Sequence, residues 1–85
     1  MPKIEIYMFE GCPYCIRAKA LLDSKGMTYT QTDIRKQPAK KAEMMERAHG
    51  RHTVPQIFID GKHVGGCDDL HALEDAGKLD PMLGL

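Results

Sequence analysis

Short apolar runs separated by polar turns divide this 85-residue chain into strands and helices. An apolar run over residues 3–8 predicts a first strand, and the alternating, β-branched segment 28–34 predicts a second. Residues 56–59 form a third short apolar run. The Asp-Gly pair that follows is a strong hairpin turn signal, so residues 62–64 are expected to return beside the third strand as the fourth.

Three segments between and after these strands carry helical signals. Residues 13–25 begin with a proline, which suits a first helical turn, and they end before a glycine. Residues 39–49 have an apolar side of two methionines and an alanine, and they also end before a glycine. A last helix is expected from residue 67 to about residue 75, and a short tail follows it.

The predicted order is therefore β-α-β-α-β-β-α, in one domain that spans residues 1–85. Domains somewhat shorter than this fold alone. Early strands joined through a helix are expected to be parallel neighbours, whereas the late hairpin pair is antiparallel. The predicted fold class is α/β, with a mixed sheet of four strands and helices on both of its faces.

Composition and charge exclude several classes of function. The 12 basic and 12 acidic residues cancel, which argues against a general electrostatic attraction to nucleic acid or an anionic membrane. No apolar run approaches the ~20 residues that span a bilayer, and the start of the chain shows no signal pattern. Three cysteines are an odd number, which fits a reducing compartment. We therefore expect a cytoplasmic protein without nucleic-acid or membrane partners.

Two cysteines lie where the first strand leads into the first helix, in the order Cys12-Pro13-Tyr14-Cys15. A helix N-terminus carries roughly half a positive charge, which favours the reactive thiolate form of the first cysteine. Cys12 is expected to be the more exposed of the two and to attack. Cys15, one turn further into the helix, is expected to be the more buried and to resolve the intermediate. The pair therefore predicts thiol–disulfide redox chemistry.

Half of a zinc site is the alternative interpretation of this cysteine pair. A zinc knuckle usually continues with glycine, whereas this chain continues as an apolar helix. Zinc would also need two further ligands. His49, His52, His63 and Cys67 are available, but His49 and His52 straddle Gly50 at a helix end. The redox interpretation is favoured, and no metal is expected.

A second motif, Thr53-Val54-Pro55-Gln56, precedes the third strand. Proline cannot donate to a sheet ladder, so it is found at strand starts and edges. Here it can leave the N–H and C=O of Val54 free to pair with an extended, peptide-like ligand. Taken alone, a simple strand-start proline is the commoner case, because only about 5–6% of X-Pro bonds are cis.

The third motif is the segment 65–70, with two glycines, Cys67, Asp68, Asp69 and a leucine. Glycines let a backbone approach a ligand closely, and a helix start offers N–H donors to a carboxylate. An aspartate beside them can accept from an ammonium, and a γ-glutamyl group presents that carboxylate and ammonium pair. The alternative is that Asp68 and Asp69 only cap a helix.

Taken together, in this order and spacing, the three motifs resemble the glutaredoxins, specifically the small bacterial dithiol type on the thioredoxin fold. The resemblance implies a thioredoxin-like fold and a monomeric enzyme that reduces protein disulfides and protein–glutathione mixed disulfides, with glutathione as co-substrate. It also implies that Pro55 is cis and lies beside the thiols, and that Val54 bonds the cysteine part of glutathione. The residues implied to bind glutathione are Tyr14, Thr53, Val54, Pro55, Gly66, Cys67, Asp68 and Asp69.

Two other functions remain open as alternatives. One is a thioredoxin-like reductant recharged by a flavoprotein reductase, which would not need the γ-glutamyl site suggested by residues 65–69. The other is an iron–sulfur carrier in which Cys12 and glutathione hold a cluster across a dimer. Pro13 and the second thiol, Cys15, disfavour the carrier.

Phe9 departs from the family pattern, because many members have a lysine three residues before the first cysteine. Loss of that charge should weaken thiolate stabilisation or glutathione affinity, unless another cation compensates. The candidates for compensation are Lys3, Arg17 and Lys19. A cation is also needed for the glycyl carboxylate of glutathione, and no motif selects among Arg47, Arg51 and Lys36.

Overall fold

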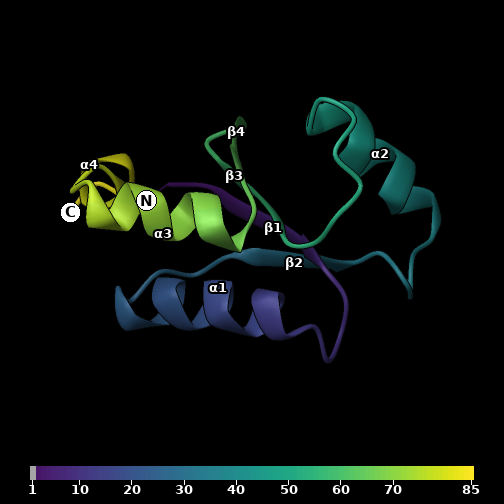
Figure 1. Ribbon diagram of the computed structural model, residues 1–85, viewed down its shortest axis with the longest axis horizontal. Coiled ribbons are helices and arrows are strands. Elements are labelled where there is room, and N and C mark those ends of the chain that lie inside the picture. The colour runs from purple at the N-terminus through teal and green to yellow at the C-terminus, as the bar shows by residue number, and fades with distance from the viewer. Residues whose placement is uncertain (1) are drawn as a thin grey trace.

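The sheet is built around β1 (Ile4–Met8), as the computed structural model of residues 2–85 shows (Figure 1). β1 pairs in parallel with β2 (Thr30–Asp33) and antiparallel with β3 (Gln56–Ile59). β3 pairs antiparallel with β4 (Lys62–Gly65) across the predicted hairpin. The strand order β2-β1-β3-β4 confirms the predicted four-stranded mixed sheet.

Helices cover both faces of this sheet, which also confirms the prediction. α1 (Pro13–Ser24) and α3 (Cys67–Asp75) pack on one face, and α2 (Ala39–Arg47) packs on the other. The two faces of β1 make this division, because successive side chains of a strand point to opposite sides. Ile4 and Ile6 join the core under α1 and α3, whereas Tyr7 joins the core under α2.

The tail contains a short helix that the sequence pattern did not predict, α4 (Leu79–Met82). Leu79 and Leu83 are buried in the same core as α1 and α3. The four-residue spacing of these two leucines was the sequence signal available for a helix. A preceding glycine and an internal proline masked it, since both residues usually mark the end of a helix.

Element bounds also differ from those predicted. β2 begins at residue 30 rather than 28, and α2 ends at residue 47 rather than 49. The helix stops there because His49 and Gly50 have φ angles of 58° and 88°, which leave the right-handed helical region. Within residues 2–85, no helix has the length and apolar character needed to cross a membrane.

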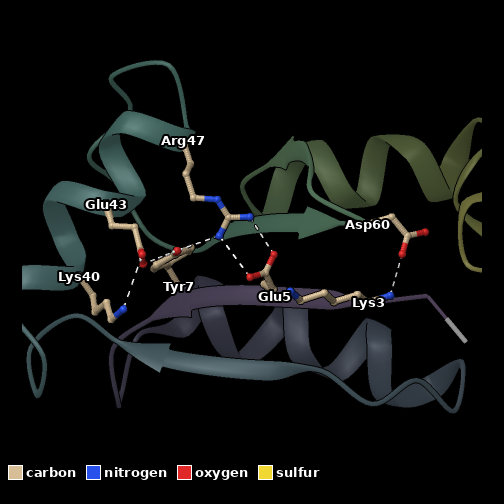
Figure 2. A network of polar contacts seen from close by, with 7 residues as sticks. All are labelled: Lys3, Glu5, Tyr7, Lys40, Glu43, Arg47 and Asp60. Atoms are coloured by element: carbon tan, nitrogen blue, oxygen red, sulfur yellow. Dashed lines mark hydrogen bonds and ion pairs between the residues drawn. The ribbon is translucent and has the colours of Figure 1, made fainter.

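A polar network fastens α2 to the sheet, as Figure 2 shows. The Arg47 guanidinium donates to both carboxylate oxygens of Glu5, at 3.3 and 2.8 Å, and to the Tyr7 hydroxyl at 2.8 Å. Tyr7 in turn donates to Glu43 at 2.8 Å. The guanidinium also lies 4.0 Å from the centre of the Phe58 ring. Hydrogen bonds from Arg47 hold the pKa of Glu5 below 4.5, so this carboxylate is charged at neutral pH.

Replacing the arginine at the centre of this network should destabilise the fold. Arg47→Met leaves the half-buried Glu5 carboxylate and the Tyr7 hydroxyl without their donor, at a cost of about 2 kcal/mol of unfolding free energy. Urea unfolding followed by circular dichroism measures the change. Lys40→Met is the matched control, because Lys40 lies on the same helix and makes only an exposed contact with Glu43.

The difference between wild type and Arg47→Met should depend on pH. The pKa of Glu5 is lowered in the folded state, so its contribution is present above pH 4.5 and is lost as the pH falls through the folded value. The two proteins should therefore converge in stability in acid. A difference that stays constant from pH 7 to pH 3 would contradict the proposed role of the ion pair.

Candidate active site

The start of α1 holds the thiol pair. Gly11 turns the chain with a φ of 87°, Cys12 occupies the N-cap position with extended backbone angles, and Pro13 begins the helix. The backbone N–H of Cys15 donates to the Cys12 sulfur at 3.4 Å. A thiolate accepts such a bond more strongly than a neutral thiol does, because a charged acceptor strengthens it. The local fold therefore gives the Cys12 sulfur a backbone hydrogen-bond donor.

The two sulfurs differ in environment more than in exposure. Cys12 is 5% exposed and Cys15 is 1% exposed, so the expected order holds but the difference is small. Burial first, and then the hydrogen bond with Cys12, raise the pKa of Cys15 to about 12. Cys15 therefore keeps its proton at neutral pH. An attack by the Cys15 sulfur would therefore require the prior loss of its proton.

The peptide bond Val54-Pro55 is cis, as the family resemblance implied. This places Val54 and Thr53 between two hollows of the surface, and both residues line each of them. Within residues 2–85, neither the N–H nor the C=O of Val54 bonds another group. A free pair of backbone groups at this position can receive an extended, peptide-like ligand.

The first hollow, here called the α3 pocket, has a volume of about 250 Å³ and lies between the cis-proline and the start of α3. It brings together all eight residues predicted from the sequence to bind a ligand: Tyr14, Thr53, Val54, Pro55, Gly66, Cys67, Asp68 and Asp69. Arg51 completes its lining. The other two candidate cations lie elsewhere, because Arg47 binds Glu5 and Lys36 pairs with Glu10.

The two neighbouring aspartates of the α3 pocket have different surroundings. Asp69 accepts from the Gly66 N–H at 2.8 Å and from Arg51 at 3.0 Å. The Gly66 bond first, and then Arg51, lower the pKa of Asp69. A Cβ at Gly65 would collide with this carboxylate, which explains the glycine there. Asp68 is exposed and forms no hydrogen bond within residues 2–85, so its carboxylate is available to a ligand.

The second hollow, here called the Cys12 groove, has a volume of about 630 Å³. Its lining comes from three loops and from the starts of α1 and α2: Phe9, Cys12, Pro13, Tyr14, Ile34, Arg35, Lys41, His52, Thr53 and Val54. The ionisable side chains besides the thiol and the tyrosine are all basic. Sequence reasoning missed Arg35 and Lys41, because no local pattern connects them with the cysteines, and it considered His52 only as a possible zinc ligand.

The cations named as substitutes for a lysine at position 9 do not lie in this groove. Lys3 is at the opposite end of β1, beside Asp60, as Figure 2 shows. Lys19 donates to Gln31 at 3.2 Å over a different hollow, and Arg17 does not line the groove. None of the three can compensate for Phe9 by direct contact there.

Of the additional ligands considered for zinc, Cys67 packs in the same core as the two thiols, whereas the histidines have separate surroundings. His63 bonds Gln56 at 2.7 Å and packs 5.5 Å from the ring of His49, while His52 lines the Cys12 groove. In the part of the chain that the structure describes, residues 2–85, no three His, Cys, Asp or Glu side chains are arranged to hold a metal ion.

Comparisons with known proteins agree with this architecture. Residues 4–64 match the family model described as Glutaredoxin. The chain is 58% identical to Glutaredoxin 3 of Escherichia coli K12, over 98% of this chain and 99% of the relative. It is 54% identical to Glutaredoxin of Pseudomonas aeruginosa, over 98% of each chain.

Solved structures show the same thioredoxin-like fold. The crystal structure of a buckwheat glutaredoxin–glutathione complex superposes with a TM-score of 0.90 at 35% identity, over 98% of this chain and 77% of that one. The solution structure of Glutaredoxin from Brucella melitensis gives a TM-score of 0.82 at 58% identity, over 95% and 87% of the two chains.

Alkylation should separate the three cysteines. At pH 7.5 we expect iodoacetamide to modify Cys12, which lines the groove, and to leave Cys15, whose raised pKa keeps it protonated. Burial also raises the pKa of Cys67, so this thiol should react slowly. Intact mass and peptide mapping would count and locate the labels. Cys67→Ser should label like wild type, and rapid labelling at Cys15 would contradict the assignment.

Proposed function

This chain belongs to the glutaredoxin family of glutathione-dependent thiol–disulfide oxidoreductases, and we propose that Cys12 and Cys15 are its redox pair and that the α3 pocket holds glutathione. The observation that best supports this proposal is the contiguity of the two hollows. Tyr14, Thr53 and Val54 line both the α3 pocket and the groove that contains Cys12. A tripeptide can therefore occupy the pocket with one end and reach the reactive sulfur with its centre.

The α3 pocket offers complementary groups to the γ-glutamyl end of glutathione. The first-turn N–H groups of α3 have no partner within the helix, and the helix dipole adds positive charge at this end. They suit the α-carboxylate, and Arg51 adds a full positive charge to the same pocket. The exposed carboxylate of Asp68 suits the α-ammonium, whereas Asp69 is occupied by Gly66 and Arg51. The free backbone groups of Val54 suit the cysteinyl part.

Reaction with a protein–glutathione mixed disulfide uses Cys12 alone. Its thiolate attacks the glutathione sulfur, the old S–S bond breaks, and the protein leaves as a thiolate that takes a proton from solvent. A second glutathione thiolate then attacks the glutathione sulfur attached to Cys12. This step releases glutathione disulfide and regenerates the Cys12 thiolate. In the net reaction the sulfur of the second glutathione is oxidised and the protein sulfur is reduced to a thiol.

Reaction with a protein disulfide also uses Cys15. Cys12 first joins one protein sulfur and releases the other. Cys15 then loses its proton and attacks the Cys12 sulfur, which closes an internal disulfide and frees the second protein thiol. The high pKa of Cys15 makes this step dependent on proton removal. The glutathione adduct on Cys12 can therefore persist until a second glutathione arrives.

We further propose that the partners are disulfide-containing or glutathionylated proteins and that the enzyme acts as a single-domain monomer in the cytoplasm. The odd number of cysteines, three, supports a reducing compartment. The balanced charge of the chain supports neither a nucleic-acid partner nor an anionic membrane surface.

Substitution of each thiol should separate the two reactions. Cys12→Ser should abolish turnover of a glutathionylated peptide, because no other sulfur from residues 2–85 lines the groove. Cys15→Ser should retain that activity and lose reduction of a protein disulfide through the internal disulfide. A coupled assay that follows NADPH consumption through glutathione reductase measures both. Full activity of Cys12→Ser would refute the assignment of roles.

Substitution of each of the two neighbouring aspartates tests the proposed γ-glutamyl site. Asp68→Asn should raise the KM for a glutathionylated peptide about fivefold, the value expected for one exposed charge contact, with kcat and stability unchanged. Asp69→Asn should instead lower the free energy of unfolding by about 0.5–1 kcal/mol, because it weakens the Gly66 cap. Kinetics together with urea unfolding distinguish the two. An unchanged KM in Asp68→Asn would exclude Asp68 as the ammonium contact.

A further inference from the structure

The Phe9 ring stacks against a cationic side chain from another loop. The guanidinium carbon of Arg35 lies 3.6 Å from the centre of the Phe9 ring, which is close cation–π stacking. Both side chains line the Cys12 groove, together with Cys12 itself. The position three residues before the first cysteine therefore has no charge of its own, yet a positive charge lies directly over it.

The loop that bears Arg35 is tied to the loop that bears Phe9. One oxygen of Asp33 accepts from the N–H groups of Arg35 and Lys36, at 2.8 and 3.1 Å. The other oxygen accepts from the N–H of Glu10, at 3.2 Å. These three bonds keep the pKa of Asp33 below 3.8, although partial desolvation acts in the opposite direction more strongly than any one of them. Asp33 therefore remains charged at neutral pH and fixes the backbone under the stacked pair.

A second contact joins the same two loops. Lys36 forms an ion pair with Glu10 at 3.4 Å, one residue along from the Phe9 and Arg35 stack on each side. The pair is exposed, so it adds little energy. It does engage Lys36, so that of these two neighbouring cations only Arg35 lines the groove.

The Arg35 guanidinium is available to a ligand. Within residues 2–85 it forms no ion pair, and the groove has no carboxylate in its lining. Stacking on an aromatic ring engages the face of a guanidinium and leaves its edge N–H donors free. Those donors match a carboxylate in a two-point arrangement. The groove therefore presents an oriented anion-binding group beside the reactive sulfur.

We propose that Arg35, positioned by Phe9, is the residue that binds the glycyl carboxylate of glutathione. This inference rests on the proposed function. With the γ-glutamyl end in the α3 pocket and the sulfur at Cys12, the glycyl end of an extended tripeptide continues into the Cys12 groove. Arg51 is on the α3 side and bonded to Asp69, so it serves the other end. Arg35 binds the ligand directly, and Phe9 acts as a positioning residue.

The test compares two mixed disulfides of one peptide, one with glutathione and one with glutathione amide, whose glycyl carboxylate is replaced by a neutral group. Wild type should have a KM about fivefold lower for the glutathione form, with equal kcat. Arg35→Gln should lose that preference and keep kcat on both substrates. Phe9→Leu should lose part of it although every charge remains, because the guanidinium loses its platform.

A rescue and a matched control complete the experiment. Phe9→Lys in the Arg35→Gln background should restore the preference, since the cation then returns to the same groove from the other loop. Lys40→Gln removes an equal charge from α2, where Lys40 pairs with Glu43 outside the groove, and should behave as wild type. Thermal unfolding of each variant checks that its fold is intact.

The outcomes separate this inference from the proposed function. A wild-type protein inactive on both mixed disulfides would refute the glutathione-dependent function itself. An active wild type without preference for the glycyl carboxylate, or an Arg35→Gln variant that keeps the full preference, would overturn only the role of Arg35. Loss of the preference in Arg35→Gln together with its return on adding Phe9→Lys would establish that role.

Discussion

The pairing register of β1, β3 and β4 is the constraint on which the site depends. Tyr7 lies opposite Gln56, and Ile57 lies opposite Gly65. Since each pairing is antiparallel, the end of β1, the start of β3 and the end of β4 all reach the same edge of the sheet. The thiol loop, the cis-proline and the start of α3 lie directly beside those three strand ends. A slip of one register position would separate them and would turn buried side chains toward solvent.

Local hydrogen bonds, rather than a large core, fix each loop at this end of the sheet. Cys12 caps α1 and accepts the Cys15 N–H, and Asp69 caps α3 through Gly66. Asp33 joins the loop after β2 to the loop after β1. Backbone donors are thereby satisfied at the helix starts and turns, and the groups left over face the two hollows. Under the proposed function, these remaining N–H, C=O and charged groups are the ones that bind glutathione.

Residues of the same type have different roles in this structure. Of the two thiols at the start of α1, Cys12 accepts a backbone N–H and Cys15 keeps its proton. Of three arginines with defined partners, Arg47 holds α2 on the sheet away from the site, Arg51 joins the α3 pocket and Arg35 lies over Phe9 in the groove (Figure 2 for Arg47). Residue type alone predicts none of these assignments, because each depends on the neighbour that the fold supplies.

The sequence alone determined the element order, the mixed sheet, the thiol pair and the motifs that form the α3 pocket. Those features depend on local periodicity, turn residues and short motifs, whose spacing survives into the structure. Only the tertiary structure decided which cations reach the site, which aspartate is free, and that the last leucines form α4 over the core. Arg35 and Phe9 lie 26 positions apart along the chain and meet because β1 and β2 end side by side. Contacts of that kind arise from strand pairing, which no local pattern at either residue encodes.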